Sequence, residues 1–313
     1  MSDTKYMKIR LKSLPAERPV PFDLFVSIGK KYVHYLRSGD KIDAAKLQKF
    51  ESRPSHPFFI LASERSAYQK FVREGLMSDR IPNREKALIL RESTLVLVEE
   101  LFERPDIDTA LSDARQVVED FVMLMDNDAS AMGHLIGLTS HDFYTYNHSL
   151  DVSVYSIGLG QAVGFRDRDL KDLGLGGLFH DIGKRQIPLE IICKTGPLTD
   201  AEWIEMKKHP QYGLAILTQH NATVNVKACA FEHHESMAGN GYPQSLSAAE
   251  IHGMARVVSV ADTYDALTTQ RSYSNPMKPS DAIELMTGKI KDKYDPEVMR
   301  ALLEIFDRIK QAA

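Results

Sequence analysis

The chain has 313 residues, 43% of them hydrophobic and 26% charged, and its formal net charge is −4. This composition is typical of a globular protein long enough for two domains, and it argues against a surface for nucleic acid polymers or membranes. No hydrophobic run is long enough to span a bilayer, and the N-terminus lacks the hydrophobic core of a signal peptide. The only cysteines, Cys193 and Cys229, are too few for a disulfide framework, so we expect a cytoplasmic protein.

Residues 1–76 mix the patterns of strands and helices. Alternating hydrophobic and polar residues, together with one continuous hydrophobic run, predict strands, and a Gly-Lys pair predicts a hairpin turn. Hydrophobic residues at helical spacing predict two short helices. The strands are expected near Ile9 and over 22–28, 31–37 and 58–62, the turn at Gly29-Lys30, and the helices over 46–51 and 66–74. We therefore predict a small α/β domain with a regulatory or docking role.

Helical patterns dominate the rest of the chain. Residues 77–128 are predicted to be a short connection followed by two linker helices, separated near Pro105. Residues 129–313 are predicted to be helical throughout, with a long helix over 143–163. The sequences Thr199–Glu202 and Ser247–Glu250 are capping boxes and predict two helix starts, and Pro296 predicts a third. The expected fold class is mostly α, a helical bundle preceded by a small α/β domain.

The stretch Gly176–Pro188, GGLFHDIGKRQIP, contains three ionisable residues, His180, Asp181 and Lys184. The hydrophobic residues before them predict a buried helix that ends near Gly183. Buried ionisable groups must find partners. From these residues alone, a bound metal with an anionic substrate and a salt-bridge network both remain open.

Further histidines and aspartates lie in hydrophobic or glycine-rich segments of the same half of the chain. A mixture of imidazoles and carboxylates without cysteine suits iron, manganese or zinc better than calcium. Facing helices of a bundle can each project such a ligand inward. Seven candidates exceed one tetrahedral site and suit two metals that share a carboxylate. They are His148, His180, Asp181, His209, His233, His234 and Asp262.

The order of these residues resembles the HD-GYP family, a branch of the HD phosphohydrolases. The resemblance covers roughly residues 140–305 and rests on several spaced motifs. In order, these are His148, His180-Asp181 with Lys184, His209-Pro210, His233-His234-Glu235, Gly239-Asn240-Gly241-Tyr242-Pro243, Asp262 and Arg271. The resemblance implies an HD-type metallohydrolase domain over residues 129–313. It also implies a phosphodiesterase that opens cyclic di-GMP to linear pGpG and then to GMP.

The resemblance further implies two divalent metal ions, with iron preferred, manganese next and zinc allowed. We expect the seven candidate ligands to hold them, with Asp181 as the bridging carboxylate. Two metals would lower the pKa of a bridging water to about 7 and clamp the phosphate oxygens. Asp181 and Lys184 are therefore the predicted catalytic residues.

Other residues receive supporting roles. With the resemblance, Lys184 and Arg271 are expected to bind phosphate; from the bare sequence, Lys184 could be a solvated lysine at a helix end and Arg271 a surface arginine. Gly239, Gly241 and Tyr242 are expected to approach the substrate, although the bare sequence indicates only a turn. Glu235 and Asp265 are expected to orient metal ligands. Trp203 is interpreted as a residue that packs on its neighbours.

Three positions depart from the family pattern. Ala238 stands where the family usually has Asp, and Ser274 stands where it has a basic residue. Tyr144 replaces the Glu of three-metal members, which favours two metals. An alternative is therefore a weakly active or inactive signalling protein that binds a cyclic dinucleotide or a partner, such as a diguanylate cyclase domain, at the GYP loop. An HD phosphohydrolase acting on another nucleotide is the third hypothesis.

Overall fold

The computed structural model describes residues 5–29, 31–42, 57–103, 107–128, 130–137, 144–269 and 276–312. The chain divides into two compact units, Met1–Leu97 and Val98–Ala313. The predicted domain boundaries after residues 76 and 128 stay predictions. The helix predicted over residues 46–51 lies outside the described residues.

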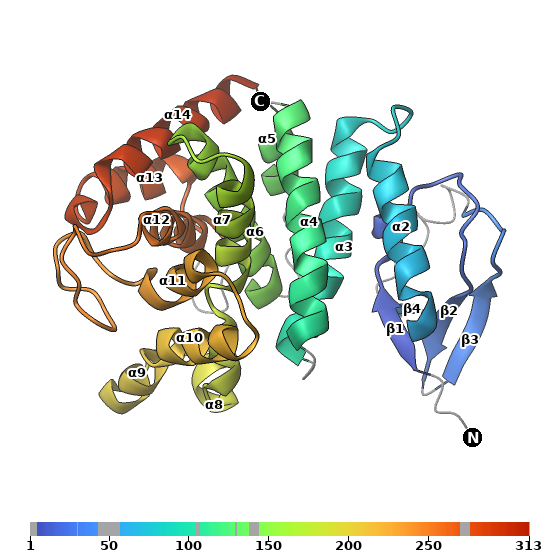
Figure 1. Cartoon of the computed structure of the whole chain (residues 1–313), viewed down its shortest axis with the longest axis horizontal. Helices are drawn as coiled ribbons and strands as arrows, with labels where there is room; N and C mark the ends of the chain where they lie inside the picture. The colour runs from blue at the N-terminus through green and yellow to red at the C-terminus, as the bar shows by residue number, and fades with distance from the viewer. Residues whose placement is uncertain are drawn as a thin grey trace. The chain divides into compact units, whose positions relative to one another are not determined.

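The N-terminal unit contains a four-stranded antiparallel sheet in the order β1-β4-β2-β3 (Figure 1). The predicted strands and the hairpin between the second and third are confirmed, and Gly29 takes a φ of +63° in that turn. One face of the sheet is buried through Ile9, Leu24 and Ile60. The elements are β1 (Tyr6–Ile9), a 3₁₀ turn (Leu11–Ser13), β2 (Leu24–Ile28), β3 (Lys31–Leu36), β4 (Phe58–Leu61), a 3₁₀ turn (Ala62–Glu64) and α2 (Arg65–Leu76).

All the regular secondary structure among the described residues of the second unit is helical, so the predicted mostly α fold is confirmed. Helix α3 (Asn83–Glu103) begins in the first unit and ends in the second. None of the described helices combines the length and hydrophobicity needed to cross a bilayer. The remaining elements are α4 (Ile107–Asn127), α5 (Ala131–Gly137), α6 (Tyr144–Ala162), α7 (Asp167–Phe179), η3 (Ile182–Gln186), α8 (Leu189–Ile192), α9 (Asp200–Met206), α10 (His209–Gln219), α11 (Val224–Glu232), α12 (Gly253–Thr268), α13 (Pro279–Thr287), η4 (Lys291–Lys293) and α14 (Pro296–Ala312).

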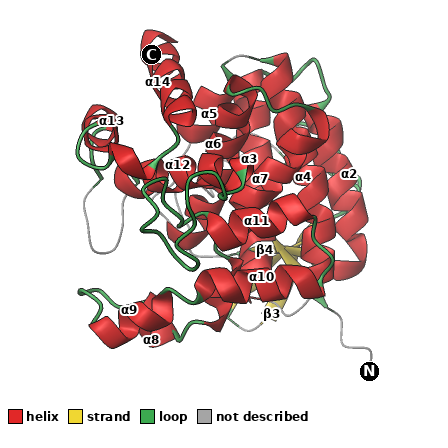
Figure 2. Cartoon of the chain, turned by 60° about the vertical axis from the view of Figure 1, so that its left-hand side comes forward, coloured by secondary structure: helices red, strands yellow, loops and turns green. Residues whose placement is uncertain are grey.

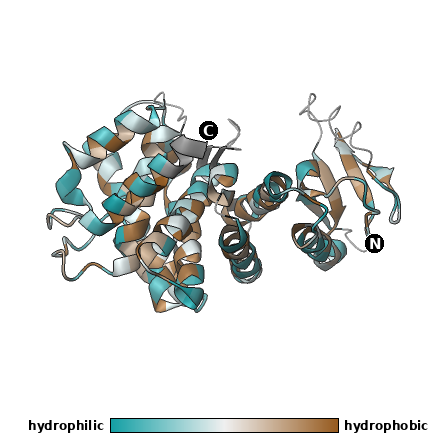
Figure 3. Ribbon diagram, turned by 90° about the horizontal axis from the view of Figure 1, so that it is seen from above, coloured by the Kyte–Doolittle hydropathy of each residue, from teal (hydrophilic) through white to brown (hydrophobic). Residues whose placement is uncertain are grey.

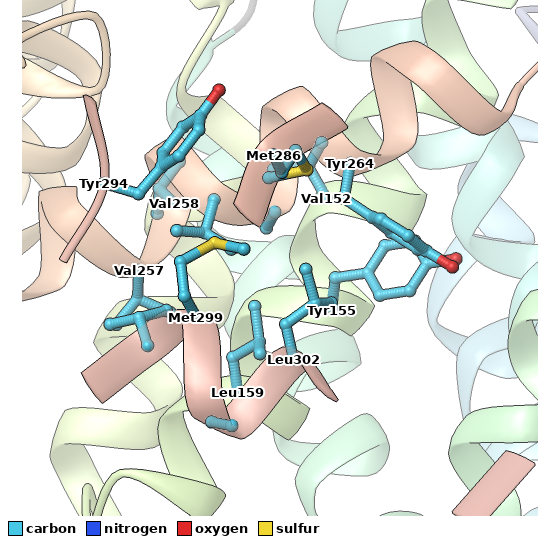
Figure 4. Close-up of a cluster of buried hydrophobic side chains, with 14 of the residues drawn as sticks. Val152, Tyr155, Leu159, Val257, Val258, Tyr264, Met286, Tyr294, Met299 and Leu302 are labelled. Atoms are coloured by element: carbon cyan, nitrogen blue, oxygen red, sulfur yellow. The ribbon is translucent and has the colours of Figure 1, made fainter. Parts of the chain in front are cut away.

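The core of the second unit lies where α6, α7 and α12 pack together, with α13 and α14 against α12. Figure 4 shows Leu159, Val258, Met299 and their neighbours filling the space between α6, α12 and α14. Hydrophobic and hydrophilic segments alternate along the helix ribbons in Figure 3, as expected for helices with one buried face. This packing fixes the two helices, α6 and α12, that carry the first and last predicted metal ligands.

Two predicted helix limits are wrong. The helix before His180 ends at Phe179, and a 3₁₀ helix, η3, follows it instead of a further α-turn. The box Ser247–Glu250 closes a turn, because its side-chain contacts are present but α12 begins only at Gly253. The capping box at Thr199 does open α9, as predicted.

Candidate metal centre

The seven predicted ligands converge from separate helices of the second unit. His148 lies within α6 and Asp262 within α12, whereas the other five stand at helix ends. Their ligand atoms form two groups, and within each group these atoms lie no more than 4.8 Å apart. The first group is Asp181, His209, His233 and His234, and the second is His148, His180 and Asp262.

The carboxylate of Asp181 lies between the two groups. Its Oδ2 atom is 3.3 Å from His180 Nε2 and 3.8 Å from His148 Nε2. Its Oδ1 atom is 3.3 Å from His209 Nε2 and 3.9 Å from His233 Nε2. Each oxygen therefore faces a different set of imidazoles, which is the arrangement that a carboxylate shared by two cations requires.

Backbone carbonyls orient three of the imidazole rings. Because a carbonyl only accepts, the Nδ1 atom of each ring carries the proton and its Nε2 lone pair is left to face the centre. Such contacts fix the tautomer and the direction of metal-binding histidines. Nδ1 donates from His180 to Gly177 O (2.7 Å), from His209 to Met206 O (2.8 Å) and from His233 to Cys229 O (3.0 Å).

The electrostatic state of the first group matches that of metal ligands, which must be neutral imidazoles or ionised carboxylates. Burial lowers the pKa of His209 to about 4 and that of His233 to about 3, and it holds the pKa of His234 well below its usual value. Burial opposes ionisation of Asp181, but Lys184, His180 and His209 together outweigh it and hold the carboxyl pKa well below its usual value. At neutral pH, three neutral rings therefore face one negative carboxylate.

His148 differs from the other histidines because it lies between two carboxylates. Its Nε2 atom is 3.2 Å from Asp262 Oδ1, and its Nδ1 atom is 2.6 Å from Asp265 Oδ2. Burial opposes protonation, but the hydrogen bonds to Asp262 and Asp265 outweigh it and raise the pKa of His148 to about 9. A cation seated between His148 Nε2 and Asp262 would take the place of that proton.

Two buried atoms at the centre favour a bound cation. Within the described chain, His180 Nε2 and Asp181 Oδ1 have no hydrogen-bond partner. Leaving a buried polar atom without a partner costs about 1–3 kcal/mol. A divalent cation accepts the lone pairs of both atoms, so the residues present fit a metal centre.

Lys184 lies at the edge of this centre, 28% exposed, with its Nζ atom against Asp181 Oδ2. An α-helical turn would place Lys184 on the same face as His180, four residues earlier. In the 3₁₀ helix η3, residues three apart share a side, which pairs Lys184 with Asp181 instead. Arg271, the other predicted phosphate-binding cation, lies outside the described residues.

The predicted substrate loop lies beside the first group. The ring of Tyr242 stacks on that of His234, with centroids 4.7 Å apart. Gly239 has a φ of +76°, which favours glycine. A Cβ atom at Gly241 would lie 2.5 Å from Glu235 Cα, so the chain can pass there only without a side chain. Both glycines thus have backbone reasons for their identity, and their contact with substrate stays a prediction.

Glu235 and Asp265 were both expected to orient metal ligands, but their contacts differ. Asp265 accepts from His148 Nδ1 at 2.6 Å. Glu235, which is 2% exposed, instead accepts from the backbone N–H groups of Gln244 at 2.7 Å and Leu246 at 3.0 Å. It therefore ties the far side of the loop to the segment that carries His234.

Replacing Glu235 by alanine is expected to loosen this loop. Two backbone donors lose their acceptor, at a cost of about 1–3 kcal/mol each. Hydrogen exchange should accelerate at the Gln244 and Leu246 amides, whereas Glu235→Gln, which keeps one carbonyl oxygen, should have a smaller effect. Unchanged exchange at both amides in Glu235→Ala would show that the carboxylate does not hold the loop.

Lys207 was not a candidate in the sequence, yet it lies beside this loop. Its Nζ atom is 5.4 Å from the centroid of the Tyr242 ring. Two features of the sequence could have identified Lys207. It stands two residues before His209, and it follows Trp203 by four residues, a spacing that places the two side chains near each other on a helix.

Comparisons with known proteins point in one direction. A family model described as "HD domain" matches residues 129–298. "Cyclic di-GMP phosphodiesterase PA4108" of Pseudomonas aeruginosa is 35% identical over 199 residues, which make up 63% of this chain and 47% of that protein. "3'3'-cGAMP-specific phosphodiesterase 3" of Vibrio cholerae is 33% identical over 173 residues, which make up 55% of this chain and 37% of that protein. The chain thus spans less than half the length of these curated relatives.

The fold also has a counterpart among solved structures. The structure titled "Bd1817, a HDG"Y"P protein from Bdellovibrio bacteriovorus" aligns with a TM-score of 0.75 at 23% identity, covering 97% of this chain and 100% of that chain. At this level of identity the likeness concerns the fold.

Proposed function

Because this chain belongs to the HD domain family, we propose that it is a metal-dependent phosphodiesterase that hydrolyses cyclic di-GMP to linear pGpG and then to GMP. The observation that carries the proposal is the position of Asp181, with one oxygen toward each of two ligand groups. The name of the relative from Pseudomonas aeruginosa supports the substrate.

The seven residues of the two groups would hold two divalent ions. When bound, such ions supply an activated water and neutralise charge on the phosphate. Lys184 contacts Asp181 Oδ2 and remains partly exposed, so it holds that carboxylate in place and offers a cation to a phosphate oxygen. Tyr242, stacked on His234, forms an aromatic wall beside the first group.

Asp265 is proposed to orient His148, and its removal tests this role. Asp265→Ala leaves His148 Nδ1 without its acceptor, and loss of such a partner weakens metal affinity about 10- to 100-fold. Metal affinity is measured by competition with a chelator. Thr269→Val is the matched control, because its hydroxyl donates to the other oxygen of Asp265 and does not touch the ring of His148. Equal affinities in Asp265→Ala and the parent would exclude the role.

The preferred metal is iron, with manganese as the alternative and zinc still allowed, because imidazole and carboxylate ligands suit all three. A cytoplasmic location is proposed from the composition. Both cysteines, Cys193 and Cys229, are free thiols, which agrees with a reducing compartment.

The test is a product analysis under exclusion of oxygen. The protein is loaded separately with iron and with manganese, given cyclic di-GMP, and the products are separated by chromatography. The parent should yield pGpG or GMP, and a His180→Ala, Asp181→Ala variant should not. A parallel reaction with 3'3'-cGAMP is required because one relative is named for that substrate. Cleavage of 3'3'-cGAMP alone would move the substrate assignment to the mixed dinucleotide.

A second candidate function is a signalling protein that keeps the metals but turns over slowly. The departure at Ala238 favours it, although Ser236 supports this turn by accepting from Ala238 N at 3.3 Å. Its partner would be a protein such as a diguanylate cyclase domain, bound at Gly239–Pro243. Binding of cyclic dinucleotide without product by the fully metallated protein would favour this candidate.

A further inference from the structure

Trp203, interpreted from the sequence as a residue that packs on its neighbours, does lie against one of them, Lys207, but it is not buried. The residue is 45% exposed on α9, although an indole is usually well covered. Figures 1 and 2 show α8 and α9 side by side at one end of the second unit, next to α10. Helix α10 begins with His209, one of the seven candidate ligands. The exposed indole therefore lies on α9, the helix that directly precedes the candidate ligand His209.

A cation connects this indole to the substrate loop. Lys207 Nζ lies 5.6 Å from the centroid of the Trp203 ring and 5.4 Å from that of Tyr242, both within range of a cation–π contact. The Tyr242 ring in turn stacks on His234. Successive contacts through Tyr242 and Lys207 therefore connect a candidate metal ligand to the exposed indole.

The charge of Lys207 is not matched by a neighbouring acid. Among the residues that the structure describes, no carboxylate forms an ion pair with Lys207, whereas Lys184 pairs with Asp181 and Lys208 with Glu205. An unmatched ammonium beside a metal centre is suited to a phosphate oxygen. An exposed indole next to it is suited to a nucleobase, because aromatic rings stack on bases of any sequence.

Hydrogen bonds fix the start of α9, the helix that carries the indole. The Thr199 side chain accepts from Glu202 N, and the Glu202 carboxylate accepts from Thr199 N and from Lys194 Nζ. At the other end of α9, Met206 O accepts from His209 Nδ1. The helix that carries Trp203 is thus hydrogen-bonded directly to a candidate ligand.

We infer that Trp203 and Lys207 form a nucleotide subsite beside the metal centre, in which the indole stacks on one guanine of the substrate and the ammonium binds a phosphate. This inference rests on the proposed function and extends it, since it assigns base recognition to α9. Trp203 is then a positioning residue that selects nucleotides over other phosphodiesters.

Trp203 is the only tryptophan in the chain, so it reports on its own occupancy through fluorescence. The full chain is stripped of metal with a chelator, which prevents turnover, and is titrated with cyclic di-GMP. Ribose 5-phosphate, which has a phosphate but no base, is titrated in parallel. Cyclic di-GMP should quench the fluorescence, and ribose 5-phosphate should leave it nearly unchanged.

Calorimetry on variants tests the stacking itself. Trp203→Ala should bind cyclic di-GMP roughly 5- to 100-fold more weakly, the usual loss for one stacked base. Trp203→Phe, which keeps an aromatic ring, should recover most of that affinity. Lys207→Gln should weaken the binding of both cyclic di-GMP and ribose 5-phosphate. Ile204→Ala is the matched control, because Ile204 is 63% exposed on the same helix and has no place in the subsite.

Three results would overturn the subsite: cyclic di-GMP that does not bind the stripped chain, binding without quenching, and parent-like affinity in Trp203→Ala. Product analysis with the metal-loaded parent separates these results from a failure of the proposed function. Hydrolysis by the parent together with parent-like affinity in Trp203→Ala would contradict the subsite but not the phosphodiesterase. If cyclic di-GMP quenches the fluorescence and Trp203→Ala binds it more weakly, but no hydrolysis occurs, the phosphodiesterase activity is contradicted and the subsite is supported.

Discussion

Replacing Asp181 by asparagine is expected to empty both proposed metal positions and to lower the rate of the proposed cyclic di-GMP hydrolysis by at least ~1,000-fold. The reason is that the two carboxylate oxygens face different imidazole sets, at 3.3 Å from His180 Nε2 and 3.3 Å from His209 Nε2. An amide keeps the size of the group but loses its charge and one acceptor. The rate loss corresponds to the several kcal/mol that metal ions contribute to phosphoryl chemistry.

The measurement is metal content by mass spectrometry after loading, alongside product formation. Asp262→Asn is the informative comparison, because Asp262 belongs only to the group with His148 and His180. It should lower occupancy of that group and spare the other. Asp172→Asn, at a buried carboxylate of α7 outside both groups, should keep the parent's metal content. Full metal content in Asp181→Asn would rule out a shared carboxylate.

The second large effect is expected from Gly183→Ala. A Cβ atom at Gly183 would overlap His209 O and lie 2.5 Å from Gly213 N, and both are backbone atoms that cannot rotate away. Overpacking of this kind should lower the free energy of unfolding by at least ~2 kcal/mol. For a unit of this size, the midpoint of thermal unfolding should fall by about 4–8 °C. Because η3 is pressed against the start of α10, metal affinity should fall as well.

Gly133→Ala provides a control with the opposite sign. Gly133 lies within α5, and among the described residues a Cβ atom there meets nothing within 4 Å. Alanine in a helix interior is preferred over glycine by about 0.5–1 kcal/mol, so this variant should be slightly stabilised. Thermal unfolding followed by circular dichroism compares the two. Equal midpoints would mean that Gly183 has no special packing role.

The helices and the candidate ligands were predictable because both leave strong local patterns. Hydrophobic spacing predicted a helix over 143–163, and α6 runs from Tyr144 to Ala162. The resemblance to the HD-GYP family rested on motif order and is confirmed by the family match and the named relatives. The strands before the helices and the hairpin at Gly29 were predicted from alternation and from the Gly-Lys pair, whereas the order of the antiparallel sheet was not.

Errors occurred where tertiary contacts decide the local backbone. The buried helix of His180 ends at Phe179 because the following residues adopt a 3₁₀ helix, in which Gly183 packs against the backbone of His209. No local pattern records that contact. The role of Glu235 was missed for the same reason, because its acceptor contacts are with amides nine and eleven residues later. The exposure of Trp203 was not predicted either, because tryptophan is usually well covered.

The wide spacing of the ligands links metal supply to folding. His148 and Asp262 stand far apart in the sequence and meet only when α6 and α12 have packed together. The unfolded chain cannot bring these ligands together, so metal binds only the folded state. Bound metal then raises the free energy of unfolding by about 2.7 kcal/mol when the free metal concentration is one hundred times the dissociation constant. In a cell short of metal, the protein would then lose abundance as well as activity, and its steady-state level would report the metal available to it.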